Sequence, residues 1–340
     1  MLEYRPVDET VYRSELLPWL PPRILDAHVH VSLRQRRVPV SPERLKGNWA
    51  MEVGVSHSWE DLRATYKMLF PGVEVFCLAF GGVFKEFDTD VENDRVLSGI
   101  KDPANRARGL FVSRPEDDPA RIRQALQDGF SGVKPYPDLA ASNETDCSIF
   151  DFLPRAHLKV LDEHSAVVVL HISRPGRIGD PDNIREVLEI ADSYLNVRLV
   201  VAHVGRAFCL PTARKGLPHF TDRPGVLFDC SANLNPDVFE YFFDALGPER
   251  LLFGSDLPIT LMRGVREYVG ERYINFTDAP YSWNTDRKSP EDEARYTFFL
   301  YEELRALISA LGRVGMGKAE MEAVLYSNAA RMLGIEDAND

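Results

Sequence analysis

Histidine and aspartate residues stand at the ends of several short apolar runs of this 340-residue sequence. The first such run leads into Asp26-Ala27-His28-Val29-His30. If the run is a strand, its period of two places His28 and His30 on one face, where two imidazoles can share one metal ion. The alternative is a pair of unrelated surface histidines, since the chain contains 8 histidines.

Three later apolar runs end in a side chain of the same kind. These side chains are His171 after residues 167–170, His203 after 199–202, and Asp256 after 251–254. A buried, hydrogen-bonded core residue is the ordinary interpretation of any one of them, but so many polar strand ends together favour one shared site. The remaining histidines are expected in helices or loops, with structural or solvated side chains: His57, His157, His164 and His219.

The apolar runs are typical of strands buried on both faces, because most are continuous rather than alternating. The expected strands are 24–29, 73–80, 108–112, 130–134, 166–171, 197–203, 225–229 and 251–254. Helical patterns cover 58–69, 118–126, 150–164, 183–194 and 236–246, with a capping box at Ser58 and an N-cap at Asn235. Repeated strand–helix units predict an α/β fold, a (β/α)8 TIM barrel. A doubly wound sheet is the alternative, but no G-x-G-x-x-G follows the first strand.

Such a barrel takes about 250 residues, so we expect one domain, 1–340, that carries additions. The additions are an N-terminal extension at 1–22 and long insertions after the first and last strands, at 33–72 and 257–290. Loops that follow barrel strands build the active face. The aromatic-rich segment 257–290 is therefore predicted to be a lid or pocket wall, and a surface excursion without function is the alternative.

The composition argues against several classes of protein. With 44% hydrophobic and 27% charged residues, the chain can build a sizeable core. A net charge of -12 disfavours nucleic acid or an anionic membrane as the main partner, although local cations still permit a small anionic substrate. No membrane span or secretory signal is apparent, and four scattered cysteines without a C-x-x-C pair favour reduced thiols. We expect a soluble, cytoplasmic protein.

The ordered motifs of the chain resemble the amidohydrolase superfamily, in its amidohydrolase-related (amidohydrolase 2) branch of metal-dependent TIM barrels. The resemblance rests on DAHVH, GVKPYP, LHISRP, VAHVGR, FGSDLP and SNAARMLGI, which span nearly the whole chain. It implies that His28, His30 and His171 hold one divalent metal ion, with Asp256 at or beside it. It also implies that His203 faces the reacting centre. The family contains hydrolases of amides and lactones as well as decarboxylases and hydratases, so membership does not fix the reaction.

The chemistry of these residue types agrees with that implication. Neutral imidazoles and a carboxylate suit zinc, or manganese if water fills the remaining positions. Asp256 is suited to accept the proton of an attacking water, and His203 to polarise a carbonyl oxygen. Lys134 ends the fourth strand and leaves an alternative open. In binuclear members a carboxylated lysine there bridges two metals; otherwise Lys134 is a substrate-facing cation or a salt-bridge partner.

Several cations are candidates for binding an anionic substrate, since guanidinium groups hold carboxylates bidentately. They are Arg174, Arg206 and Arg263, which follow His171, His203 and Asp256, together with Lys134 and with Arg34 after the first strand. For any one arginine, an ion pair at the surface is the ordinary alternative.

The function predicted from the sequence is metal-dependent hydrolysis of a C–N or C–O bond in a small, carboxylated compound. A non-oxidative decarboxylase with the same metal site is the second hypothesis, and a barrel kept only for binding is the third. Hydrolysis is preferred because the segment 201–206 lacks the glycine-rich form associated with the decarboxylases. Homodimers are common among such barrels, and the substrate itself depends on loops that the sequence does not shape.

Overall fold

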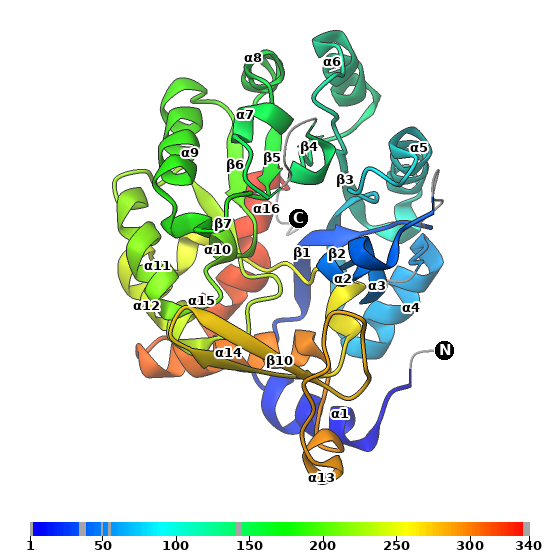
Figure 1. Ribbon diagram of the computed structural model, residues 1–340, viewed down its shortest axis with the longest axis vertical. Coiled ribbons are helices and arrows are strands. Elements are labelled where there is room, and N and C mark those ends of the chain that lie inside the picture. The colour runs from blue at the N-terminus through cyan, green and yellow to red at the C-terminus, as the bar shows by residue number, and fades with distance from the viewer. Residues whose placement is uncertain (1–2, 34–38, 49, 54–55, 141–144, 336–340) are drawn as a thin grey trace.

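A computed structural model describes residues 3–33, 39–48, 50–53, 56–140 and 145–335. Its main sheet contains eight parallel strands that neighbour one another in chain order. The sheet closes because β8 returns to β1: Ala27 N donates to Phe253 O at 2.8 Å, and His30 N donates to Leu257 O at 2.9 Å. Helices surround the sheet, and the predicted α/β barrel is confirmed (Figure 1).

Each predicted run overlaps one strand of the barrel. The strands are β1 (Arg23–His30), β2 (Glu74–Phe80), β3 (Ala107–Phe111), β4 (Gly132–Val133), β5 (Val167–Leu170), β6 (Arg198–Val201), β7 (Leu227–Asp229) and β8 (Leu251–Leu252). Several end one or two residues earlier than predicted, because the polar residue that closes the run leaves the ladder. Lys134, His171 and His203 all lie just beyond the ends of their strands.

Alternate strand residues face opposite sides, which separates two apolar layers. Val167 and Val169 belong to a cluster inside the barrel, while Val168 and Leu170 belong to the larger cluster between strands and helices. Burial of these side chains on both faces explains the continuous apolar runs of the sequence.

The helices are α1 (Pro6–Val11), α2 (Pro42–Gly47), α3 (Ala50–Val53), α4 (Trp59–Leu69), α5 (Thr89–Ile100), α6 (Pro119–Asp128), α7 (Ile149–Phe152), α8 (Arg155–Glu163), α9 (Pro181–Ser193), α10 (His203–Arg206), α11 (Leu210–Gly216), α12 (Pro236–Leu246), α13 (Pro290–Glu293), α14 (Phe299–Arg313), α15 (Lys318–Glu322) and α16 (Asn328–Leu333). The capping box at Ser58 and the N-cap at Asn235 are both present.

The single helix expected over 150–164 is two helices, α7 and α8. The break falls at Leu153 and Pro154, and Leu153 adopts φ −129° and ψ 79°. Proline disfavours the helical conformation of the residue before it and has no amide hydrogen to donate. The pattern of apolar residues continues across this break, so the sequence periodicity did not reveal it.

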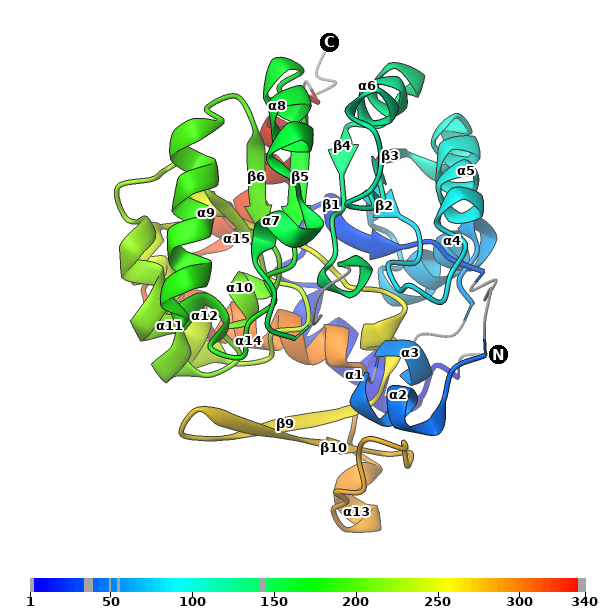
Figure 2. The ribbon, with the colours of Figure 1, turned by 45° about the horizontal axis from the view of Figure 1, so that its top comes forward.

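Two insertions lie at the end of the molecule where the strands end. Helices α2 and α3 follow β1, and an antiparallel hairpin of β9 (Gly264–Val269) and β10 (Arg272–Thr277) follows β8. Figure 2 shows the hairpin beneath the barrel on the same side as α2 and α3, with α13 beyond it. Among the described residues, no helix has the length and apolar character needed to cross a membrane.

Arg263 joins the N-terminal extension to the insertion after β8. Its guanidinium donates to both carboxylate oxygens of Asp8, at 2.7 and 2.6 Å, and to the carbonyl of Glu3. Thr297 also donates to Asp8, whose side chain is fully buried. The sequence suggested that Arg263 binds the substrate, but in the structure its guanidinium is held by the buried carboxylate of Asp8.

We expect the substitution Asp8→Ala to lower stability by about 3 to 5 kcal/mol, because it leaves a buried guanidinium without its partner. Thermal unfolding followed by circular dichroism measures the change. Glu9→Ala is the control, since Glu9 pairs with Arg13 on the exposed side of α1 and its loss should leave the melting temperature unchanged. Equal melting temperatures for the Asp8 and Glu9 variants would contradict this account of the extension.

Candidate metal centre and substrate cavity

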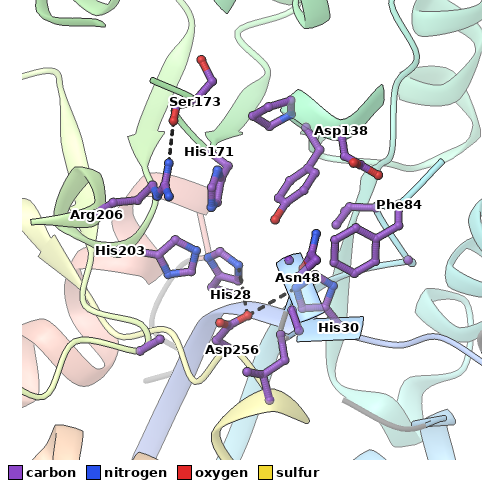
Figure 3. Close-up of a pocket in the computed structure, with 18 of the residues that line it drawn as sticks. His28, His30, Asn48, Phe84, Asp138, His171, Ser173, His203, Arg206 and Asp256 are labelled. Atoms are coloured by element: carbon purple, nitrogen blue, oxygen red, sulfur yellow. Dashed lines mark hydrogen bonds and ion pairs between the residues drawn. The ribbon is translucent and has the colours of Figure 1, made fainter. Parts of the chain in front are cut away.

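A cavity of about 490 Å³ opens at the ends of the barrel strands. Five of its lining residues are those that the sequence placed at strand ends: His28, His30, His171, His203 and Asp256. Their side chains come from β1, β5, β6 and β8 and point toward one another across the cavity (Figure 3). The fold thus brings together residues that are far apart in the sequence.

A register irregularity in β1 directs both of its histidines into the cavity. Asp26 faces the helices, where it accepts a hydrogen bond from Tyr66 of α4 at 2.7 Å. Strict alternation would send His28 the same way, but the pairing with β2 shifts between Asp26 and Val29. Irregularities of this kind re-aim side chains next to active sites. From His28 onward the period of two holds, and His30 also lines the cavity.

The closure of the barrel places Asp256 beside the β1 histidines. Its amide donates to the carbonyl of His28 at 2.8 Å, and Asp26 accepts the amide of the preceding Ser255 at 2.8 Å. Asp256 itself adopts a left-handed conformation, φ 53°, which aspartate tolerates better than most residues. One carboxylate oxygen then lies 3.3 Å from His30 Nε2 and 3.7 Å from His28 Nε2.

Hydrogen bonds on the far side of each ring determine which nitrogen faces Asp256. His28 Nδ1 contacts the carboxylate of Asp229 at 2.8 Å, and His30 Nδ1 contacts the carbonyl of Gly81 at 3.3 Å. Both partners only accept, so both Nδ1 atoms carry the proton in the neutral rings. Each Nε2 then directs a lone pair at the Asp256 carboxylate. Lone pairs converging from three side chains fit a bound cation, as in metal sites whose outer shell orients the histidines.

Burial keeps the His28 imidazole in the neutral form that binds metals. The pKa of His28 is lowered to about 4 by burial and then by the nearby charge of Lys134. Although burial raises the pKa of Asp256, the close approach of His30 and the other nearby histidines lower it overall. Neutral nitrogen donors and an ionised carboxylate are a donor set suited to a divalent ion.

His171 lines the same cavity from the end of β5. Its Nδ1 is buried and has no hydrogen-bond partner among the described residues. Burial, and next the charge of Arg206, lower its pKa well below the usual value. His171 is not part of the tight group formed by His28, His30 and Asp256, whose ligand atoms all lie within 4.8 Å of one another. Its unpartnered nitrogen nevertheless makes it available to the same ion.

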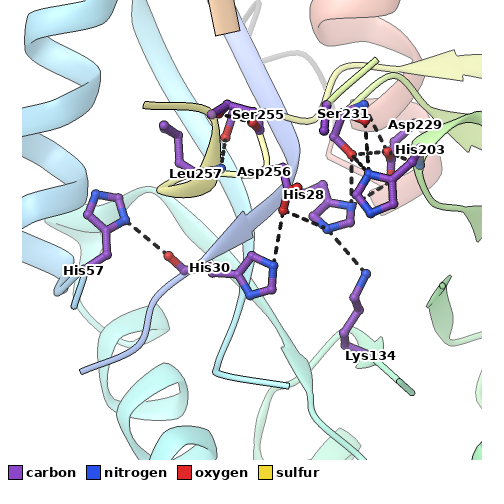
Figure 4. A network of polar contacts seen from close by, with 12 residues as sticks. His28, His30, His57, Lys134, His203, Asp229, Ser231, Ser255, Asp256 and Leu257 are labelled. Carbon is purple, nitrogen blue, oxygen red and sulfur yellow. Dashed lines mark hydrogen bonds and ion pairs between the residues drawn. The ribbon is translucent and has the colours of Figure 1, made fainter. Parts of the chain in front are cut away.

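Asp229 is a site residue that the sequence reasoning missed, although it ends the predicted seventh strand. Its carboxylate accepts from His28 Nδ1, from the amide of His203 at 2.8 Å, and from the amide of Ser231 at 3.1 Å (Figure 4). Burial raises the pKa of Asp229, but the neighbouring His28 has the stronger effect. The pKa of Asp229 therefore lies well below its usual range. Its position at a strand end was the signal that could have revealed it.

A hydrogen bond determines the tautomer of His203. Its Nδ1 lies 3.0 Å from the carbonyl of Ser231 and therefore carries the proton. Neutral His203 thus offers an unprotonated Nε2 to the cavity, and it can donate from Nε2 only as an imidazolium. Burial lowers the pKa of His203, while Asp256 and Asp229 act in the opposite direction.

A left-handed turn directs His203 and Arg206 into the cavity. All four residues of α10 have positive φ, from 50° to 62°, so this segment is not a right-handed helix. Left-handed conformation costs roughly 1 to 2 kcal/mol for each residue with a side chain. The turn persists because Val204 is buried and the amide of His203 binds Asp229. Backbone strain of this kind is concentrated at functional sites.

The predicted cations have different fates. Lys134 Nζ lies 3.4 Å from His28 Nε2, and burial lowers its pKa to about 8 although Asp229 and Asp256 oppose the shift. Arg206 lines the cavity, whereas Arg174 lies outside the lining.

Arg174 points away because two groups on α9 hold it. Its guanidinium donates to the buried carboxylate of Glu186, at 3.0 and 3.1 Å, and to Asn183. Arg34 falls outside the described residues. The lining residues that were not predicted to belong to the site include His57, Tyr136 and Arg177.

The comparisons with known proteins agree with the geometry. A family model described as amidohydrolase matches residues 25–335, which is nearly the whole chain. No curated protein sequence matches the chain.

Solved structures match the fold at low sequence identity. A 5-carboxyvanillate decarboxylase from Sphingomonas paucimobilis is 14% identical, with a TM-score of 0.58 over 93% of this chain and 100% of that one. A probable 2-pyrone-4,6-dicarboxylic acid hydrolase from Acinetobacter baumannii, with citric acid bound, is 15% identical, with a TM-score of 0.55 over 92% and 99%. An amidohydrolase from Burkholderia multivorans with bound zinc is 15% identical, with a TM-score of 0.59 over 92% and 99%.

Gly254 offers a test of how closely the barrel fits around His28. A Cβ at this position would lie 2.6 Å from the Cβ of His28 and 3.3 Å from that of Ser231. We expect Gly254→Ala to displace His28 and to weaken metal binding by about 10- to 100-fold, the scale seen when groups around a metal ligand are disturbed. Titration of the metal-free protein with zinc, followed by calorimetry, measures the change.

Gly225→Ala is the matched control, because a Cβ there would contact nothing within 4 Å. The control should bind zinc as the unchanged protein does. Unaltered zinc affinity in a folded Gly254→Ala variant would show that His28 is not held where the geometry requires it.

Proposed function

The chain belongs to the amidohydrolase family, and we propose that it is a metal-dependent hydrolase that opens an amide or lactone bond of a small carboxylated substrate. The observation that carries the proposal is the convergence of His28 Nε2, His30 Nε2 and an Asp256 oxygen at one point of the cavity. In this proposal residues 1–340 form one catalytic barrel, and the segment 257–290 is a wall or lid of the pocket.

The proposed ligands of the ion are His28, His30, His171 and Asp256. Zinc is the preferred ion because three imidazoles and one carboxylate suit it, and manganese is the second choice. A divalent ion bound there supplies Lewis acidity, which makes water a competent nucleophile near neutral pH and polarises the bond to be cleaved.

Asp256 and His203 are proposed to move the protons. Asp256 is ionised and faces the cavity, so it accepts the proton of the attacking water and delivers it to the leaving nitrogen or oxygen. His203 hydrogen-bonds an oxygen that becomes negative, provided that it is protonated on both nitrogens. The two carboxylates near His203 favour that protonated form, while burial opposes it.

Lys134 is proposed to act as a cation beside the ligands, facing the substrate. Its Nζ lies 3.4 Å from His28 Nε2, the nitrogen proposed to bind the ion. The alternative is the binuclear arrangement, in which carboxylated Lys134 bridges two ions and His171 and His203 bind the second. Metal stoichiometry separates the two arrangements.

Decarboxylation is the second candidate reaction, since the fold matches a carboxyvanillate decarboxylase as well as it matches a pyrone hydrolase. Isotope labelling distinguishes them once a carboxylated lactone, amide or aromatic acid is turned over. Hydrolysis in H₂¹⁸O places ¹⁸O in the product, whereas decarboxylation in D₂O places deuterium on the carbon that loses CO₂. A barrel that only binds would do neither.

A cytoplasmic location is also proposed. The four cysteines, Cys77, Cys147, Cys209 and Cys230, are buried and form no disulfide. Reduced buried thiols support a cytoplasmic enzyme. A homodimer is also proposed. The proposed ligand of the cavity is a small anionic molecule, and one of the matched structures carries citric acid.

We expect Asp256→Asn to reduce turnover by about 100- to 10,000-fold while much of the bound metal is retained, because the amide keeps an oxygen donor but cannot accept the proton. His203→Asn should retain the metal and lose about 100- to 1,000-fold, the scale of one lost oxyanion donor. Elemental analysis and turnover of the same samples give both quantities.

Asp182→Asn and His164→Asn are the controls, because neither residue lines the cavity. Both should keep wild-type metal content and turnover. Release of a metal ion by His203→Asn, with a wild-type content near two ions per chain, would replace the mononuclear proposal with the binuclear one.

A further inference from the structure

Arg177 is a cavity-lining cation that the proposed mechanism does not use. It opens a single 3₁₀ turn, Arg177–Gly179, between β5 and α9. Its Nη1 is buried and has no hydrogen-bond partner among the described residues. A buried guanidinium nitrogen without an acceptor is costly, because its desolvation is not offset by a hydrogen bond. The position therefore suits an acceptor that arrives with a ligand.

Arg206 lies close enough to Arg177 for their charges to interact. Its Nη1 donates to the carbonyl of Ser173 at 2.6 Å (Figure 3). The same nitrogen donates to the carbonyl of Ile172 at 3.2 Å. Burial, and next the charge of Arg177, lower the pKa of Arg206. In the described part of the chain, no carboxylate forms an ion pair with either guanidinium. Two adjacent cations thus line one cavity without an ion pair to any carboxylate of the described residues.

The two arginines are held next to each other by a close contact between the Gly205 backbone and the Ile178 side chain. Ile178 follows Arg177, and Gly205 precedes Arg206 in the left-handed turn. A Cβ on Gly205 would lie only 2.6 Å from the Cβ of Ile178, so the two turns touch. This contact fixes the position of one arginine backbone relative to the other.

Aromatic rings form the wall beside Arg177. The centre of its guanidinium lies 5.3 Å from the ring centroid of Phe208 and 5.4 Å from that of Tyr273. Phe208 and Tyr273 also line the cavity and contact each other edge to face. Tyr273 belongs to β10, in the hairpin at the mouth of the barrel (Figure 2). The insertion thereby contributes an apolar surface next to a pair of cations.

We propose that Arg177 and Arg206 together bind a carboxylate of the substrate, and that Phe208 and Tyr273 cover the planar apolar group that carries it. The inference rests on the proposed function and names its substrate class: a small aromatic or unsaturated acid whose carboxylate lies apart from the bond that reacts. Arg177 supplies two donors in a planar fork, and Arg206 adds charge from the opposite turn. Arg177 is then a specificity residue rather than one that takes part in bond cleavage.

The test is equilibrium binding of benzene-1,3-dicarboxylate, with benzene-1,3-dicarboxamide as the neutral probe, measured by calorimetry on metal-free and zinc-loaded protein. The wild-type chain should prefer the dicarboxylate in both forms. Arg177→Gln should weaken dicarboxylate binding by about 10- to 100-fold, the scale of a lost charged hydrogen bond. Binding of the diamide should not change, and Arg177→Lys should keep part of the preference because it keeps the charge.

Arg185→Gln is the matched control, since Arg185 lies on the exposed face of α9 and pairs with Asp182. It should bind both probes as the wild type does. Equal affinity of the wild type for the two probes, or unchanged dicarboxylate binding by a folded Arg177→Gln variant, would overturn the proposal. Binding of the probes to the metal-free protein does not depend on zinc. The experiment therefore tests the carboxylate site separately from the proposed metal site.

Discussion

The buried carboxylate of Asp229 is the group on which the geometry of the site depends. It accepts hydrogen bonds from His28 Nδ1 and from the amide of His203, at 2.8 Å each, and from the amide of Ser231. One bond sets the tautomer of His28, and another holds the turn that carries His203. A carboxylate buried in a barrel is stable only when such donors replace its water. The single charge of Asp229 therefore orients both His28 on β1 and His203 after β6.

Backbone conformations at the strand ends also determine where the side chains of the site lie. His203 to Arg206, Ala232 and Asp256 all have positive φ, which side-chain-bearing residues adopt at a cost. Barrel closure and hydrogen bonds to Asp26 and Asp229 hold these turns in place. The same closure brings Asp256 of the last strand against His28 and His30 of the first. Strain at the strand ends is thus offset by the packing of the sheet beneath them.

The fold and the inward-facing ligands could be predicted because they depend on local patterns. Continuous apolar runs gave the eight strands, and polar residues at their ends identified His28, His30, His171, His203 and Asp256 as neighbours in one cavity. The tautomers of the histidines could not be predicted from the sequence. They depend on hydrogen-bond acceptors that are remote in the chain, such as the carbonyl of Ser231 for His203.

The arginines show the limit of the same reasoning. Position after a strand end predicts which side of the barrel a residue lies on, but not where a long side chain turns. Arg174 binds Glu186 and Arg263 binds Asp8, because buried carboxylates on other elements compete for them. Arg177 was missed since no apolar run precedes it directly, and only its unpartnered nitrogen and its aromatic neighbours distinguish it.

The central claim, one divalent ion held where β1 meets β8, is tested most directly by an anomalous diffraction map of zinc-reconstituted crystals at the zinc edge. The account predicts one strong peak per chain, within bonding distance of His28 Nε2, His30 Nε2 and an Asp256 oxygen, with His171 turned toward it. A second peak of similar height between Lys134 and His203, or no peak beside the β1 histidines, would contradict it.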